Sequence, residues 1–159
     1  GRKVITNLPL DLERLAALDS SFPGLVQFVE NRRGIIPIDP RTRGLLSRFA
    51  KNPAEPQEGI IRAFSTIEDY ADPWRHPETG SGPFYVIDEC HMCLPRGGTA
   101  IEVEEWFSLH RHESADVLLI TQSYGKVSKD IVDLVQMCYR VKKATAFGSQ
   151  KKYIRKVQD

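Results

Sequence analysis

The 159-residue chain lacks the features that mark secreted and membrane-spanning proteins. Its three cysteines are odd in number and form no disulfide framework, which favours a reducing compartment. No apolar run approaches the roughly 18 residues of a spanning helix, and no signal peptide opens the chain. We therefore expect a soluble, cytoplasmic domain.

An excess of charge is also lacking. The 22 Lys and Arg residues nearly balance the 21 Asp and Glu residues, giving a formal net charge of +1. The overall field therefore points to no nucleic acid or acidic partner, and any such surface must be local. The length favours a single domain over residues 1–159.

A phosphate-binding loop is missing as well. The motif G-x-x-x-x-G-K-[ST] cradles phosphates with backbone N–H groups at a helix N-terminus. The sole Gly-Lys pair, Gly125-Lys126, is followed by Val127 and has Ile120 where the first glycine belongs. The chain opens with Gly1 directly before a strand-like run, so we expect an N-terminally truncated domain.

The elements that are present alternate between strands and helices. We expect a strand at residues 3–6, a helix at 10–18, and a loop-rich insertion at about 31–82 with short helices at 43–50 and 66–70. Further expected elements are strands at 84–88, 116–121 and 137–143 and helices at 100–111 and 129–136. This order predicts an α/β fold with a mainly parallel sheet and helices on both faces.

Local patterns refine this prediction. The apolar runs "FYVI" and "VLLIT" predict that strands 84–88 and 116–121 lie in the middle of the sheet. Thr99 and Glu102 have the spacing of a capping box for the following helix, and Trp106 and Phe107 are expected in the core.

Two carboxylates, Asp88 and Glu89, follow the strand at 84–88. Ligands of open parallel sheets bind beyond the carboxyl ends of the strands. There Asp88 is suited to hold Mg²⁺ through its water shell, and Glu89 to polarise a water that attacks a terminal phosphate, as in a Walker B motif. The alternative is that both acids simply end a strand and face solvent.

Neighbouring residues add candidates. Thr121 and Gln122 end the strand at 116–121, and Gln122 is suited to position the attacking water if the two strands are adjacent. Arg111 could act as an arginine finger from this subunit or a neighbouring one, or merely satisfy carbonyls at its helix end. Asn7 and His112 are further candidates.

Two other patterns are less specific. Cys90, His91 and Cys93 spell C-H-x-C, but Cys138 is the one other cysteine, so we expect no zinc site. The segment 140–156 is rich in Lys and Arg. It is interpreted either as an edge strand that blocks pairing between sheets, or as a surface for nucleic acid or anionic lipid.

With "KVITNL", "FYVIDEC", "EEWFSLHRHESADVLLITQS" and "DIVDLVQMCYRVKKA" in that order, the chain resembles the zonula occludens toxin (Zot) family of filamentous-phage assembly proteins. The resemblance implies a P-loop NTPase-like domain, of the RecA/FtsK-like type, on the cytoplasmic face of the host inner membrane. It implies ATP and Mg²⁺ as ligands, Asp88 and Glu89 as Walker B acids, Arg111 and His112 as an R-H signature, and Thr121 and Gln122 as a sensor-like strand end.

The resemblance also implies partners: self-association into a ring, other phage assembly proteins, and a membrane span outside these residues. Without a Walker A loop, this chain is expected to be inactive alone. Two alternatives stay open. "DECH" at residues 88–91 is the spelling of some superfamily-two helicases, although "TQS" stands where they carry a Ser-Ala-Thr-like motif. A non-catalytic scaffold on the same fold also fits the missing loop.

Overall fold

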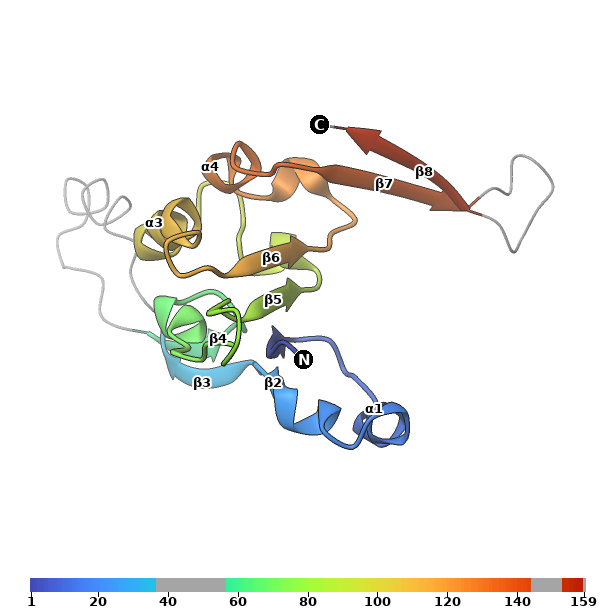
Figure 1. Ribbon diagram of the computed structural model, residues 1–159. Coiled ribbons are helices and arrows are strands. Elements are labelled where there is room, and N and C mark those ends of the chain that lie inside the picture. Colours follow the sequence, from blue (N-terminus) through green and yellow to red (C-terminus); the bar gives the residue numbers. More distant parts are fainter. Residues whose placement is uncertain (37–56, 144–152, 159) are drawn as a thin grey trace, which may run out of the picture.

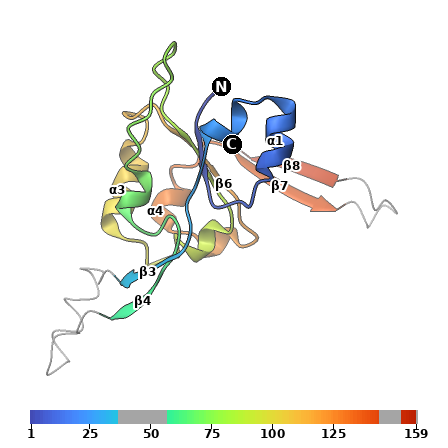
Figure 2. The ribbon, with the colours of Figure 1, turned by 90° about the horizontal axis from the view of Figure 1, so that it is seen from below.

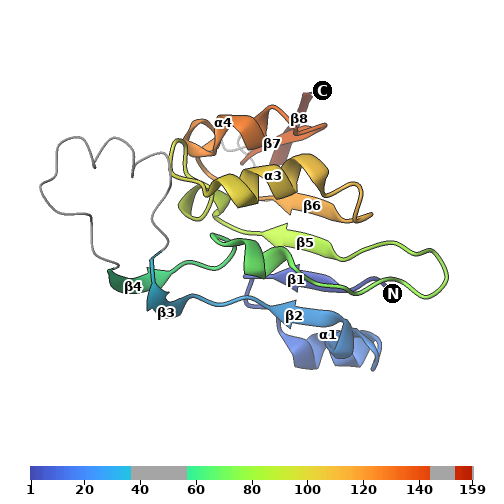
Figure 3. The same ribbon diagram turned by 90° about the vertical axis from the view of Figure 1, so that its left-hand side faces the viewer.

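The centre of the molecule is a parallel four-stranded sheet with strand order β2-β1-β5-β6 (Figure 3). The computed structural model describes residues 1–36, 57–143 and 153–158. The strands are β1 (Val4–Thr6), β2 (Val26–Phe28), β5 (Phe84–Ile87) and β6 (Asp116–Leu119). The predicted α/β fold with a mainly parallel sheet is confirmed, and β2 is a strand that the sequence pattern had not indicated.

Helices flank this sheet on two sides, with α3 and α1 opposite each other in Figure 1. The α-helices are α1 (Leu12–Leu18), α3 (Ile101–Leu109) and α4 (Lys129–Val132). Short 3-10 helices are η1 (Phe22–Leu25), η2 (Ile67–Tyr70), η3 (Cys90–Met92) and η4 (Tyr124–Lys126). No helix among the described residues has both the length and the apolar character needed to cross a membrane.

The core lies between α3 and one face of the sheet. Tyr85 and Ile87 alternate with less buried neighbours along β5, as expected for the covered face of a pleated sheet, and Ile5 of β1 pairs with Tyr85. All three are at most 1% exposed. Phe107 is buried against them, and the rings of Trp106 and Tyr70 lie 4.5 Å apart. Both aromatic residues of α3 therefore belong to the core, as predicted.

Two antiparallel ribbons extend from this body (Figures 1 and 2). One pairs β3 (Arg32–Ile35) with β4 (Glu58–Ile61), inside the predicted loop-rich stretch. The other pairs β7 (Cys138–Lys143) with β8 (Tyr153–Gln158). The helix predicted at 43–50 lies outside the described residues, and the one predicted at 66–70 is the 3-10 helix η2.

Two local predictions are wrong. Strand β6 is an edge of the described sheet, not a central strand: it pairs with β5 alone there, and Leu118 and Ile120 are 43% and 38% exposed. The capping box does not form. Helix α3 begins after Ala100, which gives no side-chain cap, while the hydroxyl of Thr99 donates to the Pro95 carbonyl at 3.0 Å.

Candidate functional site

The polar residues that follow β5 and β6 meet at one edge of the sheet. The two strands run parallel and in register, with Ile87 opposite Leu119. Asp88 and Glu89 therefore emerge beside Thr121 and Gln122, beyond the carboxyl ends of the strands. The sequence argument required these two strands to be adjacent, and they are.

Asn7, at the end of β1, fixes the backbone of Asp88 through two hydrogen bonds. Its side-chain amide donates to the Asp88 carbonyl at 2.9 Å, and the Asp88 N–H donates to the Asn7 side-chain oxygen at 2.8 Å. The hydroxyl of the preceding residue, Thr6, donates to the Val86 carbonyl of β5 at 2.7 Å. Asn7 thus orients the turn that presents Asp88, and does not itself have to meet a ligand.

Glu89 sits in a left-handed backbone conformation, with φ 47° and ψ 41°. This conformation costs a non-glycine residue of order 1–3 kcal/mol, so the surroundings must hold it. The N–H of Cys90 donates to the Ile120 carbonyl at 3.0 Å, which extends the pairing of β5 with β6 past the strand end. The amide of Gln122 donates to Glu89 Oε1 at 2.6 Å.

The second carboxylate oxygen of Glu89 faces His91, a residue that the sequence argument considered only for zinc. Oε2 is buried and accepts no hydrogen bond, while His91 Nδ1 lies 3.3 Å from it and 3.0 Å from the Thr121 hydroxyl. His91 is thus a third residue beside the carboxylate of Glu89.

These residues fit a hydrated cation better than a directly ligated one. No three His, Cys, Asp or Glu side chains gather as a metal cluster in residues 1–36, 57–143 and 153–158. Mg²⁺ in phosphate-binding sites commonly uses one or two carboxylates, with water and substrate phosphates completing the shell. Asp88 at the strand end and the unsatisfied Oε2 of Glu89 supply that kind of oxygen.

Arg111 and His112 lie at the opposite end of the sheet. Helix α3 begins near the carboxyl end of β5 and returns antiparallel to the strands, so the turn at 110–114 precedes β6. In that turn the Ser114 carbonyl accepts from the N–H of Gly82, which precedes β5. An arginine finger from the same subunit is therefore wrong. A role from a neighbouring subunit stays a prediction.

The thiols beside the site are buried. Cys90 and Cys93 belong to the core, whereas Cys138 is intermediate in exposure. Burial raises the pKa of Cys90 to about 11, helped by the charges of Glu89 and Asp88, and burial raises the pKa of Cys93 to about 12, helped by Cys90. Both are protonated thiols near neutral pH, which is the wrong state for binding zinc or attacking a disulfide.

This difference predicts selective labelling. At pH 7.5 the folded protein is expected to react with a maleimide at Cys138 at least about tenfold faster than at Cys90 or Cys93, because the thiolate is the reactive form. Peptide mass spectrometry over a time course measures the three rates. The rates of the three cysteines in denaturant serve as the reference. Equal labelling of the three cysteines in the native protein would contradict the burial of Cys90 and Cys93.

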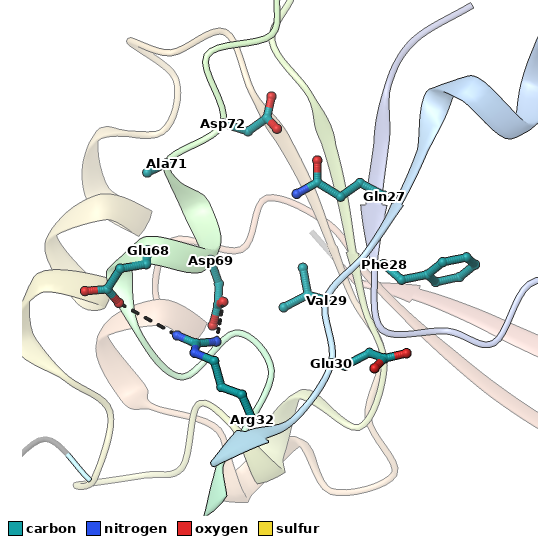
Figure 4. A pocket seen from close by; sticks show the side chains of 9 residues that line it. All are labelled: Gln27, Phe28, Val29, Glu30, Arg32, Glu68, Asp69, Ala71 and Asp72. Carbon is teal, nitrogen blue, oxygen red and sulfur yellow. Dashed lines mark hydrogen bonds and ion pairs between the residues drawn. The ribbon is translucent and has the colours of Figure 1, made fainter. Parts of the chain in front are cut away.

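A separate cavity of about 270 Å³ lies where η2 faces the end of β2 and the start of β3 (Figure 4). Arg32 reaches across it to Asp69 at 2.7 Å and Glu68 at 3.9 Å. Asp69 also accepts from the Phe64 N–H at 2.9 Å. These charges pair with each other and fasten the β3–β4 ribbon to the body, so the cavity is structural in origin.

Comparisons with known proteins agree on one family. A family model described as Zonular occludens toxin (Zot) matches residues 1–159. No curated protein matches the chain. Among solved structures, the N-terminal domain of zonular occludens toxin from Neisseria meningitidis is similar, with a TM-score of 0.51 and 15% identity, covering 99% of this chain and 75% of that one. At that identity the likeness shows the fold alone.

Proposed function

Because the chain belongs to the zonular occludens toxin (Zot) family, we propose that it is the ATPase-type module of a filamentous-phage assembly protein. In this proposal it binds ATP with Mg²⁺ at the edge of the sheet formed by Asp88, Glu89 and Gln122, and powers or scaffolds phage export at the cytoplasmic face of the host inner membrane. The contact of Gln122 with Glu89, at 2.6 Å across two adjacent strands, carries the proposal.

The proposed chemistry divides between these residues. Bound ATP and Mg²⁺ supply the transferable phosphoryl group and the charge that neutralises it. Glu89 is the candidate that accepts a proton from water, because Gln122 fixes its carboxylate through Oε1 at the exposed side of the site. Asp88, held through its backbone by Asn7, is the candidate that holds the cation through water.

In this proposal, a phosphate-binding loop outside these 159 residues completes the site. Strand β6 offers the place for it, because its second edge is unpaired in the described sheet and residues 117–120 are continuously apolar, as in strands with neighbours on both sides. A parallel strand added there would bring its own carboxyl end beside Thr121.

Self-association is part of the proposal. Arg111 is exposed and lies at the end of the sheet away from Glu89, so it reaches a nucleotide only if a neighbouring subunit presents this end to the site. A head-to-tail ring brings these two ends together at every interface. Arginine fingers supplied by a neighbour act in the same manner on transferring phosphoryl groups.

We expect ATP hydrolysis by a longer version of the protein that includes the residues encoded before Gly1, and none by the 159-residue chain alone. Steady-state phosphate release measures turnover, and a fluorescent ATP analogue measures binding. Binding without turnover in the longer protein would limit the function to a nucleotide-dependent scaffold. Absence of nucleotide binding by both proteins would overturn the proposal.

A further inference from the structure

The β7–β8 ribbon carries cations and no acids. Its two strands contain Arg140, Lys142, Lys143, Arg155 and Lys156, without a single Asp or Glu. Figures 1 and 2 show the ribbon extending away from the four-stranded sheet. It forms a separate two-stranded sheet in which each strand has an open edge among the described residues, so the cations can block pairing with other sheets. That role does not account for the exposed aromatic rings on one face.

Its two faces differ. The register pairs Tyr139 with Val157 and Val141 with Arg155, which puts these four residues on one face. Tyr153, opposite Lys143 in the register, belongs to the same face. Each of the four uncharged side chains is exposed: Tyr139 49%, Val141 60%, Tyr153 61% and Val157 44%. The opposite face carries Arg140, Lys142 and Lys156.

The two tyrosines lie at opposite ends of this exposed face. Tyr139 and Lys143, the partner of Tyr153, are four residues apart along β7, or about 14 Å at roughly 3.4 Å per residue. The guanidinium of Arg155 lies 5.4 Å from the ring centroid of Tyr139. The face thus alternates aromatic rings with a cation, the combination on which unpaired bases stack and phosphates are neutralised.

We propose that the β7–β8 ribbon binds single-stranded nucleic acid. Tyr139 and Tyr153 stack on different bases of one strand, and Arg155 on the same face neutralises its phosphates. A lipid surface is disfavoured because Arg155 occupies the middle of the apolar face, and burying a cation among acyl chains is costly. This proposal does not depend on ATP hydrolysis.

The test is the anisotropy of a fluorescein-labelled oligothymidylate of about 20 nucleotides, titrated with the 159-residue chain. The double variant Tyr139→Leu/Tyr153→Leu keeps the apolar area but loses both rings, and we expect it to bind at least about tenfold more weakly. Tyr139→Phe/Tyr153→Phe keeps the rings and is expected to bind as the unchanged protein does. Circular dichroism verifies that every variant is folded.

A second set of variants tests the charges. Arg155→Gln removes the cation on the face of the two tyrosines and is expected to reduce the slope of log affinity against log salt by about 0.7, the contribution of one phosphate contact on a single strand. Lys126→Gln/Lys129→Gln removes two exposed cations elsewhere and should leave the slope unchanged.

Three results would overturn the proposal: no oligonucleotide binding by the unchanged chain, equal binding by the leucine and phenylalanine variants, or an unchanged salt slope in the Arg155→Gln variant. Vesicles of phosphatidylserine and phosphatidylcholine form the parallel arm. Binding to them without binding to the oligonucleotide would identify a lipid surface and refute a nucleic-acid one. Loss of ATP turnover affects none of these readouts, so the two proposals fail separately.

Discussion

Replacing Glu89 by glutamine in the longer protein is expected to lower ATP turnover by about 10²- to 10⁴-fold and to leave ATP binding within about twofold. The amide oxygen of the new side chain still accepts from Gln122, so the geometry that now places Oε1 at 2.6 Å from that amide is kept. The substitution removes the carboxylate that we propose as the general base. Single-turnover phosphate release and nucleotide titration measure the two quantities.

The matched control is Glu105→Gln, an exposed residue on α3 that the structure does not place at the site. It should leave both quantities unchanged. If Glu89→Gln hydrolyses ATP at the rate of the unchanged protein, Glu89 is not the general base, and the acids at 88 and 89 merely end a strand. If the unchanged protein and the Glu89→Gln variant both bind ATP and neither hydrolyses it, the result favours a non-catalytic scaffold over an enzyme.

The strain at Glu89 has a physical meaning in this context. A carboxylate in a left-handed conformation, with one buried oxygen lacking a hydrogen bond, is less stable than the same group facing solvent. The surrounding contacts maintain it: the Cys90 N–H on the Ile120 carbonyl and the Gln122 amide on Oε1. Such local cost is characteristic of positions held for a ligand or a reaction, and a strand end facing solvent does not require it.

The sequence predicted that these strand ends meet because the signal for them is local. One apolar run is followed by two acids, and another is followed by Thr121 and Gln122. Each run forms a strand, and because the two strands are parallel, their carboxyl ends lie at the same edge of the sheet. The role of Asn7 was not predictable in this form, because its two hydrogen bonds join residues 81 positions apart. His91 could have been found from its position two residues after Glu89, had it been considered as a partner of that carboxylate.

The errors have a common origin. Apolar composition predicted that β6 is central, but composition does not report which neighbours a strand has, and the described sheet leaves one edge of β6 open. Arg111 follows the helix between the two strands in sequence, and sequence order alone does not show at which end of the sheet that helix finishes. A right-handed crossover, however, returns the chain to the start of the next parallel strand. Helix α3 therefore carries Arg111 away from Glu89.

The second large effect is expected at this far end of the sheet. Replacing Gly82 by alanine should lower the free energy of unfolding by about 2–3 kcal/mol, because the new Cβ would lie 2.4 Å from the Glu113 carbonyl oxygen and 3.2 Å from the Ala115 nitrogen. Both are backbone atoms in the turn that leads into β6. The turn cannot retreat without loosening the bond from the Gly82 N–H to the Ser114 carbonyl, now 2.8 Å.

Thermal unfolding measured by circular dichroism tests this prediction, with an expected fall in Tm of roughly 4–12 °C for a domain of this size. Gly125→Ala is the matched control: its new Cβ would meet no atom within 4 Å, so a change within about 0.5 kcal/mol is expected. Equal Tm values for the two variants would show that the turn at 113–115 is not packed on Gly82. Glu89→Gln should not share the loss, because it removes a partly buried charge and keeps its hydrogen bond to Gln122. The two substitutions would then have different effects at the two ends of the sheet. Gly82→Ala at the amino ends would lower stability, and Glu89→Gln at the carboxyl ends would lower ATP turnover.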